Sequence, residues 1–284
     1  MRIISRIPGF RRRPPTVSVV RLSGIIGGAA MVRRGLVHQS LAPVLEKAFS
    51  GRRTVAVALA INSPGGSPVQ SDLIAAHIIT LSRERDIPVF AFCEDVAASG
   101  GYWLALSAGE IYANQSTIVG SIGVVTAGFG LDRLIERFGI ERRVYTTGPK
   151  KGMLDPFRPA DPDHVEHLRG VHAVLFERFR AFVAERRGHR LAAPEDELYS
   201  GAFWSGSQAL EYGLIDGFGS LRSVMRERFG TRVRFRQFGM RRGVLGRLQR
   251  ATGWSDPDGA ADRTWADELL AAVETRTMWG RFGL

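Results

Sequence analysis

Two apolar runs of strand length, each ending in a glycine-containing loop, constrain the fold of this chain most strongly. The runs are TVAVALAIN (54–62) and IPVFAFC (87–93), and they lead into NSPGGSP and AASGG. A nearly continuous apolar run of this length is typical of a strand covered on both faces, as in a parallel sheet. Because residues 69–83 between the runs have helical periodicity, the pattern predicts an α/β fold with a mainly parallel sheet and flanking helices.

Other segments extend the same alternation. We expect further strands within 16–28, 110–114 and 116–126, and a strand with a basic, solvated face from residue 231. We expect helices at 39–50 and 102–109, and a long helix from Asp161 and Pro162 to about residue 187. The apolar stripe of that long helix comprises Val165, Leu168, Val171, Leu175, Phe179 and Phe182.

Composition divides the chain into three parts. Residues 1–15 form a basic, flexible N-terminal segment, 16–225 the main domain, and 226–284 a basic C-terminal extension with a strand and an amphipathic helix. The net charge of +11 raises nucleic acid and anionic lipid as partners. The sequence has no nucleic-acid-binding motif, so nucleic acid is not expected as a partner.

Location is predicted from what the sequence lacks. It has no run of about 18 apolar residues, and its basic N-terminus lacks the apolar region of a secretory signal. The lone cysteine, Cys93, fits a reducing compartment and lies in an apolar strand, where thiols are usually inert. We therefore expect a cytoplasmic protein, with peripheral contact between its arginine-rich ends and the inner face of the cell membrane as a further expectation.

Ser99, in AASGGYW (97–103), is the candidate nucleophile. It follows a predicted buried strand, and Gly100 permits a sharp turn into a helix that we expect to begin at residue 101 or 102. The Gly100 amide could then stabilise an oxyanion formed by attack at Ser99, and the Gly65-Gly66 backbone could supply a second donor. Taken alone, however, this stretch is more typical of an ordinary strand–helix turn.

A serine nucleophile also needs a base, and two residue types remain open on the residues alone. None of the six histidines lies in or beside the glycine loops, although a triad assembled in space stays open. Only three of the 39 basic residues are lysines, and two of these, Lys150 and Lys151, are adjacent. Since arginine does not deprotonate in proteins whereas a desolvated lysine does, this pair indicates a candidate base.

Five segments in order resemble the signal peptide peptidase A family of serine–lysine peptidases, in its short single-repeat form. They are NSPGGS (62–67), AASGGYWLA (97–105), GSIGV (120–124), TGPKKGMLDPFRP (147–159) and YSGAFWSGSQALEYGLIDGFG (199–219). The resemblance covers roughly residues 17–220, which makes 16–225 a predicted peptidase domain. It implies a crotonase-like (Clp protease-like) fold.

The resemblance also implies a role for each candidate residue. Ser99 is the nucleophile, Lys151 the general base, with Lys150 as the alternative, and Ser121 orients the lysine amine. Gly66 and Gly100 match the oxyanion donors. The family relationship further implies peptide substrates, apolar ones such as signal-peptide remnants, and a homo-oligomer in which serine and lysine meet at subunit contacts. No cofactor and no metal are expected.

Two alternative hypotheses about function remain. A crotonase-like acyl-CoA enzyme would use the two-glycine oxyanion hole on a thioester without a serine nucleophile. A non-catalytic basic scaffold would bind membrane or nucleic acid in a salt-sensitive manner that survives Ser99→Ala.

Overall fold

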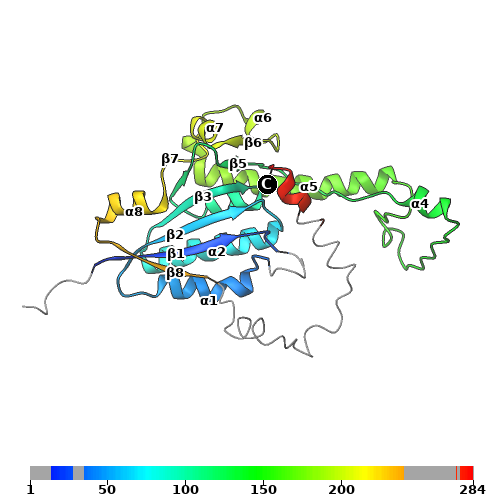
Figure 1. Ribbon diagram of the computed structural model, residues 1–284. Coiled ribbons are helices and arrows are strands. Elements are labelled where there is room, and N and C mark those ends of the chain that lie inside the picture. Colours follow the sequence, from blue (N-terminus) through cyan, green and yellow to red (C-terminus); the bar gives the residue numbers. More distant parts are fainter. Residues whose placement is uncertain (1–13, 28–34, 240–272, 274–275, 284) are drawn as a thin grey trace, which may run out of the picture.

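A computed structural model describes residues 14–27, 35–239, 273 and 276–283 of the chain (Figure 1). Its strands are β1 (Thr16–Ser23), β2 (Thr54–Ser63), β3 (Val89–Ala98), β4 (Glu110–Ala113), β5 (Ile118–Gly120), β6 (Phe203–Ser205), β7 (Gly217–Phe218) and β8 (Arg234–Phe238). Its helices are α1 (His38–Phe49), α2 (Pro68–Arg85), α3 (Gly100–Ala105), α4 (Asp132–Arg137), α5 (Pro162–Arg187), α6 (Glu195–Leu198), α7 (Gly206–Glu211) and α8 (Leu221–Phe229).

The strands form one sheet in the order β6-β5-β3-β2-β1-β8, with β4 pairing with β3 and β7 with β4. Every pair is parallel except β5 with β6. The prediction of an α/β fold with a mainly parallel sheet and flanking helices is therefore confirmed. The basic strand expected from residue 231 is also confirmed as β8, which pairs with β1.

Helices cover both faces of the sheet, as the apolar runs predicted. Buried residues of α1, α2 and α3 form one core with alternate residues of β2 and β3. On the opposite face, Val224 and Met225 of α8 pack with Ala58 and Phe90. Helices on both faces of the sheet therefore bury β3.

The sheet forks along β3. The first half of this strand pairs with β4 through Phe90, Ala91 and Phe92, whereas Val96, Ala97 and Ala98 pair with β5. Between the two halves, the Thr117 hydroxyl donates to the Glu94 carbonyl oxygen at 2.7 Å. The fork lets β5 end beside the residue that follows β3.

The end of α5 fixes α3 beneath this region. The buried guanidinium of Arg187 donates to the Gly213 carbonyl oxygen and forms an ion pair with Asp216 at 2.7 Å. The Tyr102 hydroxyl donates to the neighbouring Leu214 carbonyl oxygen at 2.8 Å. Burial raises the pKa of Tyr102, so the phenol remains protonated and keeps this hydrogen bond.

Residues 124–161, which we call the arm, extend away from the sheet at the far end of α5 (Figure 1). The arm contains α4, which has no buried residue. The predicted apolar stripe of α5 is confirmed only in its second half, because Phe179 and Phe182 are buried whereas Val171 is exposed. The first half of α5 continues outward toward the arm, where the sheet does not cover it.

Several expected boundaries differ from the observed ones. α3 begins at Gly100, not at 101 or 102, because the turn at Ser99 leads directly into helical backbone. Of segment 116–126 only Ile118–Gly120 is a strand, since Ser121 takes a positive φ and ends the pairing. The N-terminal segment 1–13 and most of the predicted C-terminal helix lie outside the described residues, although 276–280 is helical. Within the described ranges, no helix is both long and apolar enough to cross a membrane.

Candidate active site

Ser99 lies in a strained turn between β3 and α3. Its φ is 51°, a left-handed conformation that a residue with a Cβ adopts at a cost of about 1–3 kcal/mol. Two backbone hydrogen bonds hold it there, from Ser99 N to the Gly120 oxygen at 2.7 Å and from Trp103 N to the Ser99 oxygen at 3.0 Å. The side chain is partly exposed, and its hydroxyl has no hydrogen-bond partner among the described residues. The turn therefore leaves the hydroxyl partly exposed to solvent.

The two glycine loops lie side by side, because they follow the neighbouring parallel strands β2 and β3. A Cβ placed on Gly65 would lie 2.8 Å from the Ser99 Cβ and 3.0 Å from the Gly100 amide nitrogen. A Cβ on Gly100 would in turn lie 2.5 Å from the Ser71 hydroxyl. Only glycines permit this close approach, so the loop after β2 lines the turn that carries Ser99.

Gly66 is held so that its amide stays available. The backbone of Ile26 bonds on both sides of it, with Ile26 N donating to the Gly65 oxygen and Ser67 N donating to the Ile26 oxygen, both at 2.8 Å. A Cβ on Gly66 would lie 2.0 Å from the Ile26 oxygen, and its φ of 143° also favours glycine. Within the described residues, neither the Gly66 nor the Gly100 amide has a hydrogen-bond acceptor. Both amides are free to donate to a reacting oxygen.

Ser121 immediately follows the strand that borders Ser99. Gly120 pairs with Ala98, and Ser121 N donates to the Ala202 oxygen at 2.7 Å, so both neighbouring strands position it. Ser121 is buried and has a φ of 52°. The structure thus brings the ends of β3 and β5 together, each with a serine in a left-handed conformation.

The lysine pair is not brought to Ser99 within one chain. Lys150 and Lys151 lie in the arm and are exposed. The backbone bonds of this loop are local, such as Lys151 N to the Gly148 oxygen at 3.2 Å. The arm's α4 lies at the far end of α5 from the sheet (Figure 1). Four of the five predicted site residues therefore gather at the carboxyl ends of β2, β3 and β5. Lys151 lies apart from them in the arm.

Three of the six histidines have other hydrogen-bond partners, and Cys93 is buried. His38 and His77 contact each other between α1 and α2, with ring nitrogens 3.2 Å apart. His172, on the outer half of α5, bonds Thr126 at 2.8 Å. Burial raises the pKa of Cys93 to about 12, which keeps its thiol protonated and supports the prediction that it is inert.

A hollow of about 440 Å³ lies at the fork in the sheet, apart from the candidate site. Its lining includes Ala60, Phe92, Asn114 and Phe218, from β2, β3, the loop after β4, and β7. None of the five predicted site residues lines it. This hollow and the strained serine thus lie at different places on the sheet.

Sequence reasoning missed the groups that support the glycine loops. The Ile26 backbone fixes Gly66, the Ser63 hydroxyl accepts from Gly65 N at 3.2 Å, and the Ser71 hydroxyl donates to the Ser67 oxygen. The first of these contacts has no local pattern, because Ile26 and Gly66 become adjacent only after β1 and β2 have paired. Ser71 alone had a local signal, as a polar residue on the buried side of a helix.

The structure is an α/β protein with a strained serine beside two available amides. The sequence model described as Peptidase family S49 matches residues 82–229. The chain is 34% identical over 197 residues to Putative protease slr0021 of Synechocystis sp., which covers 69% of this chain and 68% of that protein. This chain belongs to peptidase family S49.

Other relatives are longer than this chain. Putative signal peptide peptidase SppA of Enterococcus faecium is 31% identical over 182 residues, which are 64% of this chain and 52% of that protein. A Brucella abortus protein named Na(+)/H(+) antiporter NhaA is 44% identical over 280 residues. The chain spans only 38% of its length. Among solved structures, a variant of 1510-N membrane-bound stomatin-specific protease in complex with a substrate peptide has a TM-score of 0.47 and 14% identity. That match covers 92% of this chain and 98% of the other.

Proposed function

We propose that this chain is a serine endopeptidase in which Ser99 is the nucleophile and Lys151 of a neighbouring copy is the general base. Membership of family S49 supports peptide-bond hydrolysis. The observation that carries the assignment of Ser99 is its strained turn beside the available amides of Gly66 and Gly100. An acyl-CoA enzyme on the same fold would not need that strain at a serine.

The reaction begins with a neutral Lys151 amine that takes the proton of the Ser99 hydroxyl as the oxygen attacks the peptide carbonyl carbon. The resulting oxyanion accepts hydrogen bonds from the Gly66 and Gly100 amides. Collapse of this intermediate breaks the C–N bond, and the lysine ammonium returns its proton to the departing amine. Water, deprotonated by the same lysine, then hydrolyses the acyl ester and restores Ser99. Ser121 orients the lysine amine by a hydrogen bond.

The exposure of the arm supports the proposal that the base is supplied by a neighbouring copy. Phe129, Phe138 and Tyr145 are among its exposed apolar residues. An exposed apolar surface of this kind marks a protein contact. A homo-oligomer that covers the arm would carry Lys151 to the Ser99 of the next copy and desolvate its amine, which favours the neutral form.

Co-expression of two inactive variants tests this arrangement. Ser99→Ala and Lys151→Ala should each abolish peptide hydrolysis without unfolding the protein, whereas Lys150→Ala should stay active. Mixed oligomers should regain about a quarter of the wild-type rate, because random assembly pairs an intact serine with a neighbour's intact lysine at one site in four. If the mixed oligomers stay inactive, Lys151 does not act between copies. Full activity of Lys151→Ala alone would exclude it as the base.

Substrates and location are part of the same proposal. We expect extended apolar peptides, such as signal-peptide remnants or other membrane-associated peptides, cleaved on the cytoplasmic side with the protein held peripherally to the inner membrane face. The net charge of +11 supports contact with an anionic surface. The full chain should sediment with vesicles that contain phosphatidylglycerol and remain free with phosphatidylcholine alone. Equal behaviour with both would rule out the electrostatic contact.

A further inference from the structure

Three aromatic side chains gather on the sheet face beside the candidate site. Phe282 is buried against Val96 and Ala98 of β3. Trp279 packs in the same cluster, and the rings of Phe203 and Phe282 meet edge to face at 5.1 Å. We call Phe203, Trp279 and Phe282 the aromatic platform. It joins β6 to the C-terminal residues, far apart in the sequence.

The strand ladder sets the distance between this platform and Ser99. Phe203 pairs with Gly120, and Gly120 pairs with Ala98 and accepts the hydrogen bond from Ser99 N. Two strand spacings separate Phe203 from the end of β3, which is about 10 Å. An extended peptide advances about 3.3 Å per residue, so this distance corresponds to about three residues of a bound chain.

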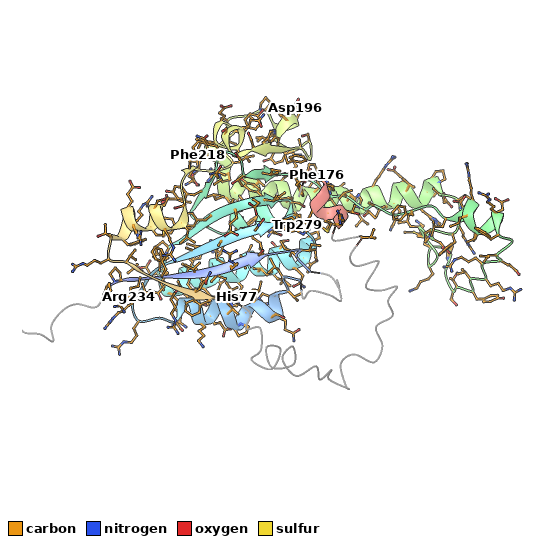
Figure 2. The ribbon with its side chains drawn as sticks, viewed as in Figure 1. His77, Phe176, Asp196, Phe218, Arg234 and Trp279 are labelled. Atoms are coloured by element: carbon orange, nitrogen blue, oxygen red, sulfur yellow. The ribbon has the colours of Figure 1, made fainter. Side chains whose placement is uncertain are left out.

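Part of the platform is open to an apolar ligand. Phe203 is 44% exposed although its ring already contacts Phe282. Trp279 is partly exposed on the C-terminal helix, as Figure 2 shows where it is labelled beside the sheet. Aromatic rings of this kind bury much apolar area at little conformational cost. A polar peptide would gain nothing from these rings, whereas an apolar side chain would be removed from water.

We propose that the aromatic platform binds an apolar side chain of the substrate, about three residues from the scissile bond. This inference rests on the proposed peptidase function and assigns Phe203 and Trp279 a role in substrate selection. It also makes the C-terminal helix part of the substrate site. The platform acts on binding and not on bond cleavage, since none of its residues lies in the turn that carries Ser99.

A peptide series tests the platform. Matched peptides carry either leucine or serine at one position, placed two, three or four residues on either side of the cleaved bond. Wild-type protein should prefer leucine at one of these positions, and Phe203→Ala should reduce this preference in kcat/KM about tenfold, mainly through KM. Trp279→Ala should act in the same direction. Phe218→Ala is the matched control, because Phe218 is 40% exposed on β7 and is labelled apart from Trp279 in Figure 2.

A binding measurement separates failure of the platform from failure of the peptidase. The same peptides are titrated calorimetrically into Ser99→Ala protein, with and without Phe203→Ala. A leucine preference that disappears with Phe203→Ala supports the platform even if hydrolysis is not detected. A preference unchanged in both Phe203→Ala and Trp279→Ala, or equally reduced by Phe218→Ala, would overturn it. Ser99-dependent hydrolysis with no leucine preference at any position would overturn the platform and leave the peptidase proposal intact.

Discussion

The two ends of α5 differ in what surrounds them. At its C-terminal end, Phe179 and Phe182 stack on Trp103 of α3, and Arg187 is buried. Nearer its N-terminal end, Val174 is 72% exposed and leads toward an arm with exposed aromatic residues. One end of α5 is thus buried by other parts of the same chain, whereas its other end is exposed. We call the sheet and the helices packed against it the body. We infer that the body is covered within one copy and that the arm is covered by another copy.

The largest expected effect lies at the buried end of α5. Phe182→Ala should lower the free energy of unfolding by about 3–5 kcal/mol, because it removes a ring stacked on Trp103 and leaves a cavity. Val174→Ala, the matched change at the exposed end, should leave the free energy of unfolding of the dissociated protein unchanged. Urea denaturation at low protein concentration measures both. Equal effects of the two substitutions would contradict the distinction between body and arm.

Replacing a glycine by alanine should affect activity differently in the body and in the arm. Gly66→Ala should reduce kcat about 100-fold or more, because its Cβ would displace the loop that supplies an oxyanion donor. Gly128→Ala in the arm should keep full activity, since no atom lies within 4 Å of the added Cβ. Steady-state hydrolysis of an apolar reporter peptide makes the comparison. A fully active Gly66→Ala protein would remove Gly66 from the proposed mechanism.

Assembly should depend on the arm and not on exposed apolar residues of the body. Phe138→Asp, at a side chain that is 69% exposed, should shift the sedimenting species toward the monomer and lower activity in parallel. Leu73→Asp, on the outer surface of α2, should leave the assembly unchanged. Analytical ultracentrifugation distinguishes the two, and a monomeric wild-type protein would refute assembly through the arm.

The smallest expected effect is a pH dependence within the body. Burial, and then the neighbouring His38, lower the pKa of His77 below 6.5, although Glu46 and Glu84 oppose the shift. The unfolded chain therefore binds more protons than the folded one, so stability is present above pH 6.5 and is lost as the pH falls below that value. His77→Gln should reduce the loss of unfolding free energy between about pH 7 and pH 5. An unchanged loss would show that other groups cause it.

The sequence was most informative where structure is local. Apolar runs predicted β2 and β3, and the glycines that follow each run predicted the two loops. The extent of burial along α5 was not predictable, since Val171 and Phe179 have the same periodicity and differ only in what the fold places nearby. The roles assigned to Ser99, Ser121 and Lys151 stay predictions. The separation of Lys151 from the sheet depends on tertiary structure that periodicity does not specify.

The pairing of β8 with β1 has a consequence for how the chain folds. Thr16 lies opposite Arg234 and Val20 opposite Phe238, so more than 200 residues separate the partners of this parallel pair. A contact of such sequence separation forms slowly, because closing the intervening loop costs entropy before the pair is stabilised. Until β8 arrives, β1 is an open edge with unpaired backbone groups, which other unfinished chains could join. This edge of the sheet is therefore protected from aggregation only after β8 has been synthesised and has paired with β1.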